Sequence, residues 1–105
     1  MPRLEVEGAT VEVSDEGFLL DPKLWNDEVA RALAAAMGVS ELTGEHWKVV
    51  RYLRKHYLDF GLAPMVRKLC KQTDTPLKRI YELFPPGPAK GACKVAGMPN
   101  ADGCI

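Results

Sequence analysis

The stretch that decides the fold is residues 43–61, TGEHWKVVRYLRKHYLDFG. Thr43 is a good N-cap residue, and Glu45 in the first turn is favoured by the helix dipole. Apolar side chains then recur at helical spacing on one side, while lysine and arginine recur on the other. Gly61 ends the pattern. We predict a helix over roughly 44–60 whose apolar side carries Trp47, Val50, Leu53, Tyr57 and Phe60.

The segments on both sides of this helix predict three shorter helices. Asn26 can cap a helix that Gly38 ends. Downstream, Pro64 opens a third helix, and Thr75 with Pro76 caps a fourth. Their apolar positions are Val29, Ala30, Leu33, Ala34 and Met37, then Met65, Val66, Leu69 and Cys70, then Leu77, Ile80, Tyr81 and Phe84.

The N-terminal segment has a different period. LEVEGATVEV, at 4–13, alternates apolar and polar residues and breaks at Gly8. This alternation predicts a β-hairpin over about 3–14. Asp15, Glu16 and Gly17 then mark a turn before the helical part begins.

The C-terminal segment closes the domain. Pro88 can open a short last helix that Gly97 ends. Residues 98–105 have no periodicity and few apolar groups to anchor them, which is typical of a mobile arm. We therefore expect a mainly α fold with a small N-terminal hairpin, a compact helical bundle over residues 1–97 and a flexible arm over 98–105.

Composition is that of one ordinary globular domain. The 105 residues are 47% hydrophobic and 27% charged, with no net charge. No apolar run approaches a membrane span and no signal peptide opens the chain, so we expect a cytoplasmic protein. Residues 1–47 carry three Lys/Arg against ten Asp/Glu, whereas residues 48–94 carry eleven against three. The basic half could face an anionic partner, or the two halves could simply attract each other.

The chain ends in GACKVAGMPNADGCI, which holds two of its three cysteines. We expect Cys104 to be exposed and within reach of a partner, although Asp102 and the C-terminal carboxylate would disfavour its thiolate. Lys94 adjoins Cys93, and Lys90 shares its helix face, so we expect them to favour a Cys93 thiolate. The eleven-residue spacing lets the two thiols meet, which would make them a redox switch. The alternative is a pair of incidental cysteines.

Other chemistry has little support in the sequence. Cys70 lies beside Leu69 on an apolar helix face, where we expect a buried small hydrophobe. There is no CxxC motif, and His46 and His56 form no recognised cluster with the cysteines, so neither a metal site nor a cofactor is expected.

The basic segment 64–84 allows one further interpretation. Its two short helices and intervening turn suggest a helix-turn-helix, which could meet DNA phosphates or an acidic protein surface. The basic residues concerned are Arg67, Lys68, Lys71, Lys78 and Arg79.

Taken together, several motifs resemble the DsrC/TusE family of sulfur-carrier proteins from about Gly17 to Ile105. They are GFLLDPKLWNDEVA, LTGEHWKVVRYLRKHY, PMVRKLC, IYELFPPGPAKGACKVAGMP and the ending GCI. The C-terminal pattern LFPxGPAKxACKxAG followed by a penultimate cysteine is highly specific. The resemblance implies a small helical domain with an N-terminal hairpin and a mobile arm. It also implies a protein co-substrate and not a self-sufficient enzyme.

The resemblance assigns roles to particular residues. Cys104 would enter a partner's active site and take up sulfur, and Cys93 would close a disulfide or a trisulfide with it. Lys90 and Lys94 would tune Cys93 and help the arm dock. Arg67 matches the family's PxxR motif and would face the folded-back arm.

The resemblance also implies partners. They are a dissimilatory siroheme sulfite reductase, a membrane-bound reductase complex that releases the sulfur, and sulfur-relay proteins. Relatives often read AGLPKPTGC where this chain reads AGMPNADGC, so Asn100, Ala101 and Asp102 make the arm less basic and leave the exact partner open.

Because both cysteines are present, we favour the sulfite-reductase carrier. One alternative is a relay protein for tRNA thiolation that uses Cys104 alone. The other is a DNA-binding regulator that acts through the basic helices.

Overall fold

The computed structural model describes residues 3–6 and 8–100. Two strands, β1 and β2, precede five helices, α1 to α5. Their bounds are β1 Arg3–Val6, β2 Ala9–Glu12, α1 Asp27–Ala36, α2 Gly44–Phe60, α3 Val66–Thr73, α4 Leu77–Leu83 and α5 Cys93–Val95, with a 3-10 turn at Pro22–Leu24 and a π-helical turn at Pro88–Ala92. The predicted mainly α fold with an N-terminal hairpin is confirmed.

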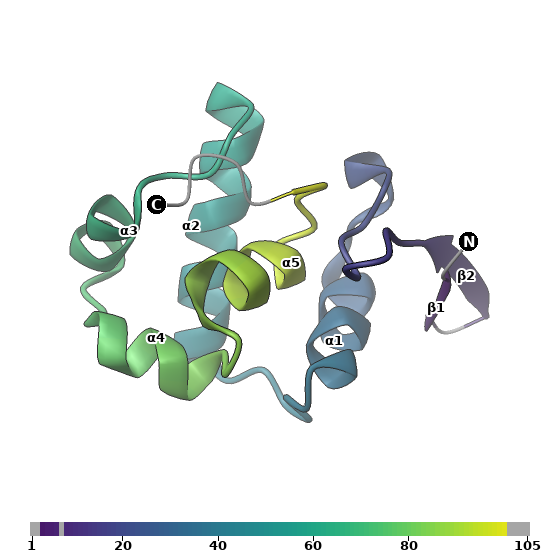
Figure 1. The fold of residues 1–105 in the computed structure, drawn as a ribbon, viewed down its shortest axis with the longest axis horizontal. Coiled ribbons are helices and arrows are strands. Elements are labelled where there is room, and N and C mark those ends of the chain that lie inside the picture. The colour runs from purple at the N-terminus through teal and green to yellow at the C-terminus, as the bar shows by residue number, and fades with distance from the viewer. Residues whose placement is uncertain (1–2, 7, 101–105) are drawn as a thin grey trace.

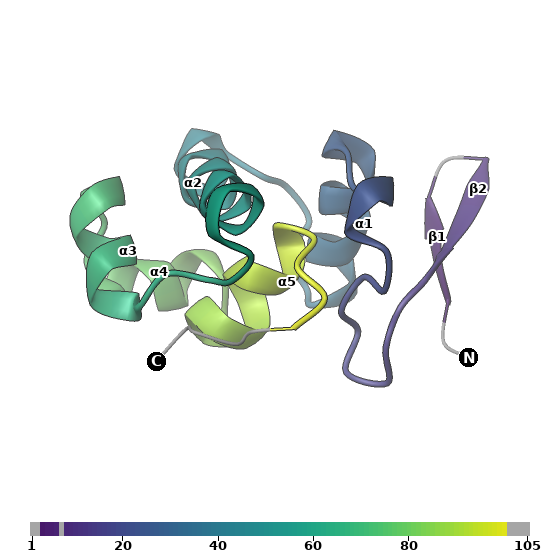
Figure 2. The same cartoon turned by 90° about the horizontal axis from the view of Figure 1, so that it is seen from above.

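The short helix α5 lies at the centre of the molecule. It sits between α1 and α2 in both views, with the hairpin outside α1 and the α3–α4 pair at the opposite end (Figure 1 and Figure 2). The main apolar cluster surrounds α5, and the side chains of Phe84, Ile80, Leu53 and Met98 are among its fully buried members. A three-residue helix in this position depends on its neighbours for stability, because isolated short helices are marginal in water.

Local capping explains where the two longer helices begin. The Asn26 side chain accepts a hydrogen bond from the Val29 N–H at 2.9 Å at the start of α1. At the start of α2, the Thr43 N–H donates to Nδ1 of His46 at 3.0 Å. His46 thereby takes the place that a glutamate often has in a capping box. Its other ring nitrogen, Nε2, lies 2.9 Å from the Leu83 carbonyl oxygen, which links α2 to the end of α4.

The hairpin is antiparallel, and Leu4 pairs with Val11. Gly8, with a φ of +75°, lies in its turn. Val11 and Val13 are buried and join the apolar cluster that α1 also lines. The predicted alternation is thus confirmed in the positions that face the core.

Four of the predicted apolar positions are wrong. Phe60, Met65, Leu77 and Tyr81 are 62%, 57%, 43% and 51% exposed. Phe60 is the last residue of α2, and Met65 immediately precedes α3, so both lie where the helices extend past the core. Val49, which the pattern left out, is fully buried.

The end of the domain also differs from prediction. Met98 is 1% exposed and belongs to the apolar cluster, although we had assigned it to the unanchored arm. The chain therefore stays attached to the core one residue beyond the expected boundary at Gly97. Residues 101–105 of the predicted arm lie outside the described residues.

The charge asymmetry is partly resolved by contacts between the two halves. Arg79 of α4 lies 2.7 Å from Glu45 of α2, and Arg51 of α2 lies 3.5 Å from Asp27 of α1. These ion pairs support the simpler interpretation that the acidic and basic halves attract each other.

The Glu45–Arg79 pair predicts a pH-dependent stability. Hydrogen bonding to Arg79 lowers the pKa of the Glu45 carboxyl below its ordinary value of 4.5. A carboxyl with a lowered folded-state pKa stabilises the fold above its unfolded pKa, and this stabilisation disappears as the pH falls through the folded pKa. We expect Glu45→Gln to lower the urea midpoint slightly at neutral pH and not at all in acid, because the pair is exposed.

The matched control is Glu41→Gln, since Glu41 is also exposed and makes no ion pair within the part of the chain that is described. Urea midpoints of both variants across the acid range test the prediction. A deficit for Glu45→Gln that persists unchanged in acid would contradict it.

Candidate functional site

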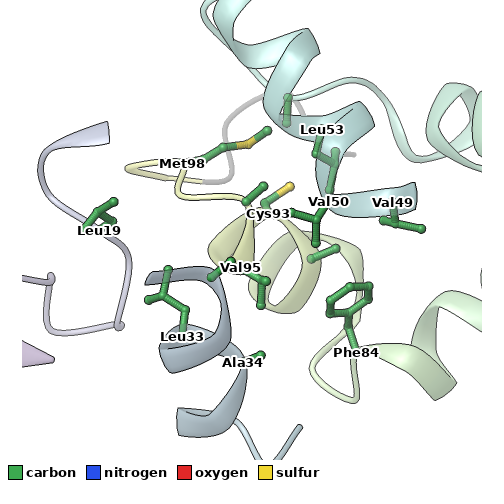
Figure 3. Packing of buried hydrophobic residues seen from close by; sticks show 14 of the residues in the cluster. Leu19, Leu33, Ala34, Val49, Val50, Leu53, Phe84, Cys93, Val95 and Met98 are labelled. Carbon is green, nitrogen blue, oxygen red and sulfur yellow. The ribbon is translucent and has the colours of Figure 1, made fainter. Parts of the chain in front are cut away.

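Cys93 is the first residue of α5 and is fully buried. Its side chain points toward α2, where Val50 and Leu53 lie, and Met98 lies beside it (Figure 3). Apolar burial disfavours a thiolate. The Cys93 side chain has no accessible surface in this packing, and its predicted activation as a thiolate stays a prediction.

The two lysines lie in different environments. The Lys94 ammonium lies 5.1 Å from the ring centroid of Phe18, against the loop that contains Gly17. It is thus directed toward that loop and away from α2, toward which Cys93 points. Lys90 is exposed on the π-helical turn. Their predicted roles in tuning Cys93 and in docking stay predictions.

The other predicted site residues are not brought to Cys93 by a described contact. Arg67 is exposed on α3 and makes no hydrogen bond or ion pair within residues 3–6 and 8–100. Cys70, on the same helix, is half-buried and packs against the core, so it is less deeply buried than we expected. Cys104 lies outside the described residues, so its predicted meeting with Cys93 or Arg67 stays a prediction.

The last turn of α5 ends in a Schellman motif that places Met98 next to Cys93. The Gly97 N–H donates to the Lys94 carbonyl at 3.0 Å, and the Met98 N–H donates to the Cys93 carbonyl at 3.3 Å. Gly97 has a φ of +77°, the left-handed conformation that this motif requires and that glycine adopts without strain. Residue 98 of such a motif usually packs on the residue five positions earlier, which here is Cys93.

Two side chains from distant parts of the chain contact this turn. The Trp25 indole N–H donates to the Val95 carbonyl at 2.8 Å. The Arg54 guanidinium, from α2, lies 3.4 Å from each of the Ala96 and Gly97 carbonyl oxygens. Desolvation by the surrounding protein lowers the pKa of the Arg54 guanidinium from its ordinary value, although arginine remains charged in proteins. We call Trp25 and Arg54 the arm-root clamp.

The predicted helix-turn-helix pair is present as α3 and α4, but Arg79, one of its basic residues, forms ion pairs within the protein. Arg79 is paired with Glu45 at 2.7 Å and Glu82 at 3.3 Å. The Lys68 ammonium lies 5.6 Å from the Phe60 ring centroid. The ion pairs offset the charge of Arg79, one of the five basic residues that the DNA-binding alternative would use.

The described residues contain neither a candidate metal site nor a candidate membrane-spanning helix. Among the described residues, no group of three or more His, Cys, Asp or Glu side chains could hold a metal ion. Within the same residues, none of the helices combines the length and apolar character that crossing a bilayer requires.

The sequence profile of a family described as "DsrC like protein" matches residues 5–105. The chain belongs to the DsrC family. The match includes both Cys93 and Cys104, and it spans the clamp, the π-helical turn and the end of the chain. The family resemblance expected from the sequence motifs is confirmed.

Relatives of two kinds occur within the family. The dissimilatory-type sulfite reductase subunit gamma of Nitratidesulfovibrio vulgaris is 42% identical over 105 residues, and the match covers 100% of both chains. Sulfurtransferase TusE of Salmonella typhimurium is 40% identical over 106 residues, covering 94% of this chain and 96% of that protein. The crystal structure of the oxidized gamma-subunit (DsrC) of Archaeoglobus fulgidus superposes with a TM-score of 0.90 at 47% identity, covering 99% of this chain and 100% of that one.

Sequence analysis of this DsrC-family chain did not single out Trp25 or Arg54. For Arg54 a signal was present. It follows Trp47 by seven positions and Val50 by four, which places a guanidinium on the predicted apolar side of the helix. A charged residue on such a face is rarely buried without a polar partner. Its partners, the carbonyls of residues 22, 96 and 97, are distant in sequence and had no signal of their own.

Proposed function

We propose that this chain is a sulfur-carrier protein and a co-substrate of a dissimilatory siroheme sulfite reductase. Its likeness to a gamma subunit of such a reductase extends over the full length of both chains, which is the observation that carries the proposal. That relative is a subunit of sulfite reductase by name, and we extend the association to this chain.

In this proposal Cys104 is the sulfur acceptor. Its position is seven residues beyond Gly97, the left-handed residue of the Schellman turn. A chain of that length spans at most about 25 Å when fully extended. Cys104 can therefore enter a recessed active site on a partner while the folded domain remains outside.

Cys93 is the second thiol and closes the bridge after the arm returns. The net reaction consumes one sulfite, the two thiols, four protons, and two electrons from the electron donor of the reductase. It yields one trisulfide and three water molecules. Each thiol loses its proton and is oxidised as it bonds to the central sulfur, which is reduced. A second reductase, membrane-bound in the pathway that the resemblance implies, would supply the electrons that reopen the bridge.

The proposal is tested by the intact mass of the purified, reduced chain after incubation with sulfite, a reductant and a siroheme sulfite reductase. We expect a gain of one sulfur atom together with the loss of two titratable thiols. Matched incubations without the reductase, or without sulfite, should leave the mass unchanged. Unmodified thiols in the complete mixture would contradict the carrier function.

A sulfur-relay protein for tRNA thiolation is the second candidate. The TusE relatives are nearly as similar as the gamma subunit, at 40% against 42% identity. A relay needs only Cys104, because it passes sulfur onward and does not store it in a bridge. Cys93 is thus the residue that separates the two candidates, since only the carrier requires it.

A further inference from the structure

The carbonyl groups at the end of α5 are covered by side chains from other parts of the chain. A helix leaves its last carbonyls without intrahelical partners. Here the Val95 carbonyl accepts from the Trp25 indole at 2.8 Å, and the Ala96 and Gly97 carbonyls lie 3.4 Å from the Arg54 guanidinium. The end of α5 is therefore held by two donors that belong to neither α5 nor the arm.

The two donors also hold each other. The Arg54 guanidinium lies 4.9 Å from the ring centroid of Trp25, within the range of a cation–π contact. Its Nη2 donates to the Pro22 carbonyl at 2.7 Å, three residues before Trp25. One guanidinium thus joins α2, the turn at residues 22–25 and the end of α5. Movement of any of the three disturbs the contacts of the other two.

This clamp acts on the turn that packs over Cys93. The Met98 N–H bonds to the Cys93 carbonyl, and the two side chains lie side by side in Figure 3. Met98 and Cys93 are 1% and 0% exposed. A reagent or a second thiol cannot attack a sulfur that has no accessible surface, so a reaction at Cys93 requires a local opening of this part of the structure.

We propose that Trp25 and Arg54 are positioning residues that hold the end of α5 closed and thereby set how often Cys93 becomes accessible. The inference deepens the proposed function, because in a carrier this opening controls when Cys93 can bond to the loaded Cys104. Both residues act through the backbone carbonyls of residues 95–97.

The test measures alkylation of Cys93 by iodoacetamide in the full-length Cys104→Ser chain under native conditions. In this reaction the Cys93 sulfur forms a thioether bond and iodide leaves with the thiol proton. Peptide mass mapping separates the Cys93 adduct from any adduct at Cys70. The global free energy of unfolding of each variant is measured in urea, so that local opening can be separated from global unfolding.

Arg54→Met removes the guanidinium, and with it the hydrogen bonds to the carbonyl oxygens of residues 22, 96 and 97. Trp25→Phe removes the indole N–H and keeps a ring over Gly97. Since hydrogen bonds from a charged donor are stronger than neutral ones, we expect Cys93 of Arg54→Met to be alkylated about ten-fold faster than in the unsubstituted comparison chain, a change of about 1.4 kcal/mol. Trp25→Phe should show a smaller increase in the alkylation rate at Cys93. The rate of Arg54→Lys should lie between those of the unsubstituted comparison chain and Arg54→Met.

Arg51→Met is the matched control. Arg51 also lies on α2, and its guanidinium is also 4.9 Å from a tryptophan centroid, that of Trp47. Its contacts within the described part of the chain are with Asp27 and Trp47, which lie outside the turn at residues 95–97. We expect this variant to alkylate at Cys93 at the wild-type rate.

An unchanged rate in both clamp variants would overturn the inference. So would an increase that Arg51→Met shares, or one that follows the global free energy of unfolding alone. If Arg54→Met does not fold, Trp25→Phe and Arg54→Lys still give the comparison. The assay contains no sulfite and no reductase, so a chain that fails to load sulfur would refute the proposed function and leave the alkylation result standing.

Discussion

Replacing Cys104 with serine is expected to abolish the gain of sulfur when the chain is incubated with sulfite, reductant and sulfite reductase. A hydroxyl is neither ionised at neutral pH nor able to retain sulfur as a persulfide, so no other group at this position can replace the thiol. Intact mass before and after incubation measures the effect. We expect the variant to keep its unmodified mass at every time point.

Cys70→Ser is the control for the loss of any one thiol. Cys70 is half-buried on α3, and the proposal gives it no part in the transfer. This variant should gain sulfur like wild type. Equal loading of Cys104→Ser and wild type, or a loss of loading in Cys70→Ser alone, would mean that the acceptor is wrongly assigned.

Cys93 then separates the carrier from the relay. Alanine is the better substitution here. A serine hydroxyl without a hydrogen-bond partner at this fully buried position would lower the free energy of unfolding by about 1–3 kcal/mol. A carrier with Cys93→Ala should take up sulfur on Cys104, form no bridge, and lose the sulfur to added thiol. A relay with the same substitution should deliver sulfur to its acceptor at the wild-type rate.

Much of the fold follows from local signals in the sequence. Asn26, Thr43 and Gly61 are found at the helix ends where capping chemistry places them, and the period of four apolar positions in α1 matches its buried face. The hairpin is equally local, since its turn and its alternating residues lie within ten positions of one another. The specific cysteine motif also sufficed to identify the family.

The features that sequence analysis missed depend on contacts between distant segments. Arg54 is explained only by carbonyls 32 to 43 positions away in the chain. Met98 is buried because the Schellman turn directs it back onto α5. The residues around Met98 show no apolar periodicity in the sequence, so the sequence did not indicate its burial. Phe60 continues the apolar period of α2 but lies past the end of the core, which the period cannot show.

The burial of Cys93 follows from the same kind of contact. Adjacent lysines suggested an activated thiol, whereas packing of α5 between α1 and α2 places the sulfur in an apolar environment. A local charge count could not anticipate this, because the direction of each side chain depends on where the helix packs. The sequence therefore predicts a role for two thiols, and it could not show that one of them, Cys93, is buried.

Replacing Gly97 with alanine is expected to lower the free energy of unfolding by about 2–5 kcal/mol, from left-handed strain together with overpacking. Gly97 has a φ of +77°. An added Cβ would overlap Trp25 Cδ1 and lie 2.6 Å from Trp25 Cγ. The indole cannot move aside without losing its hydrogen bond to the Val95 carbonyl. Urea unfolding followed by circular dichroism measures the change.

Gly61→Ala separates the two causes, because Gly61 has the same φ of +77° and an added Cβ there has nothing within 4 Å. It should cost only the strain of the left-handed conformation, about 1–2 kcal/mol. The excess cost at position 97 then reports the contact with Trp25. If the two alanines prove equally destabilising, the indole is not in tight contact with Gly97, and Trp25 would contribute to the clamp only through its hydrogen bond to the Val95 carbonyl.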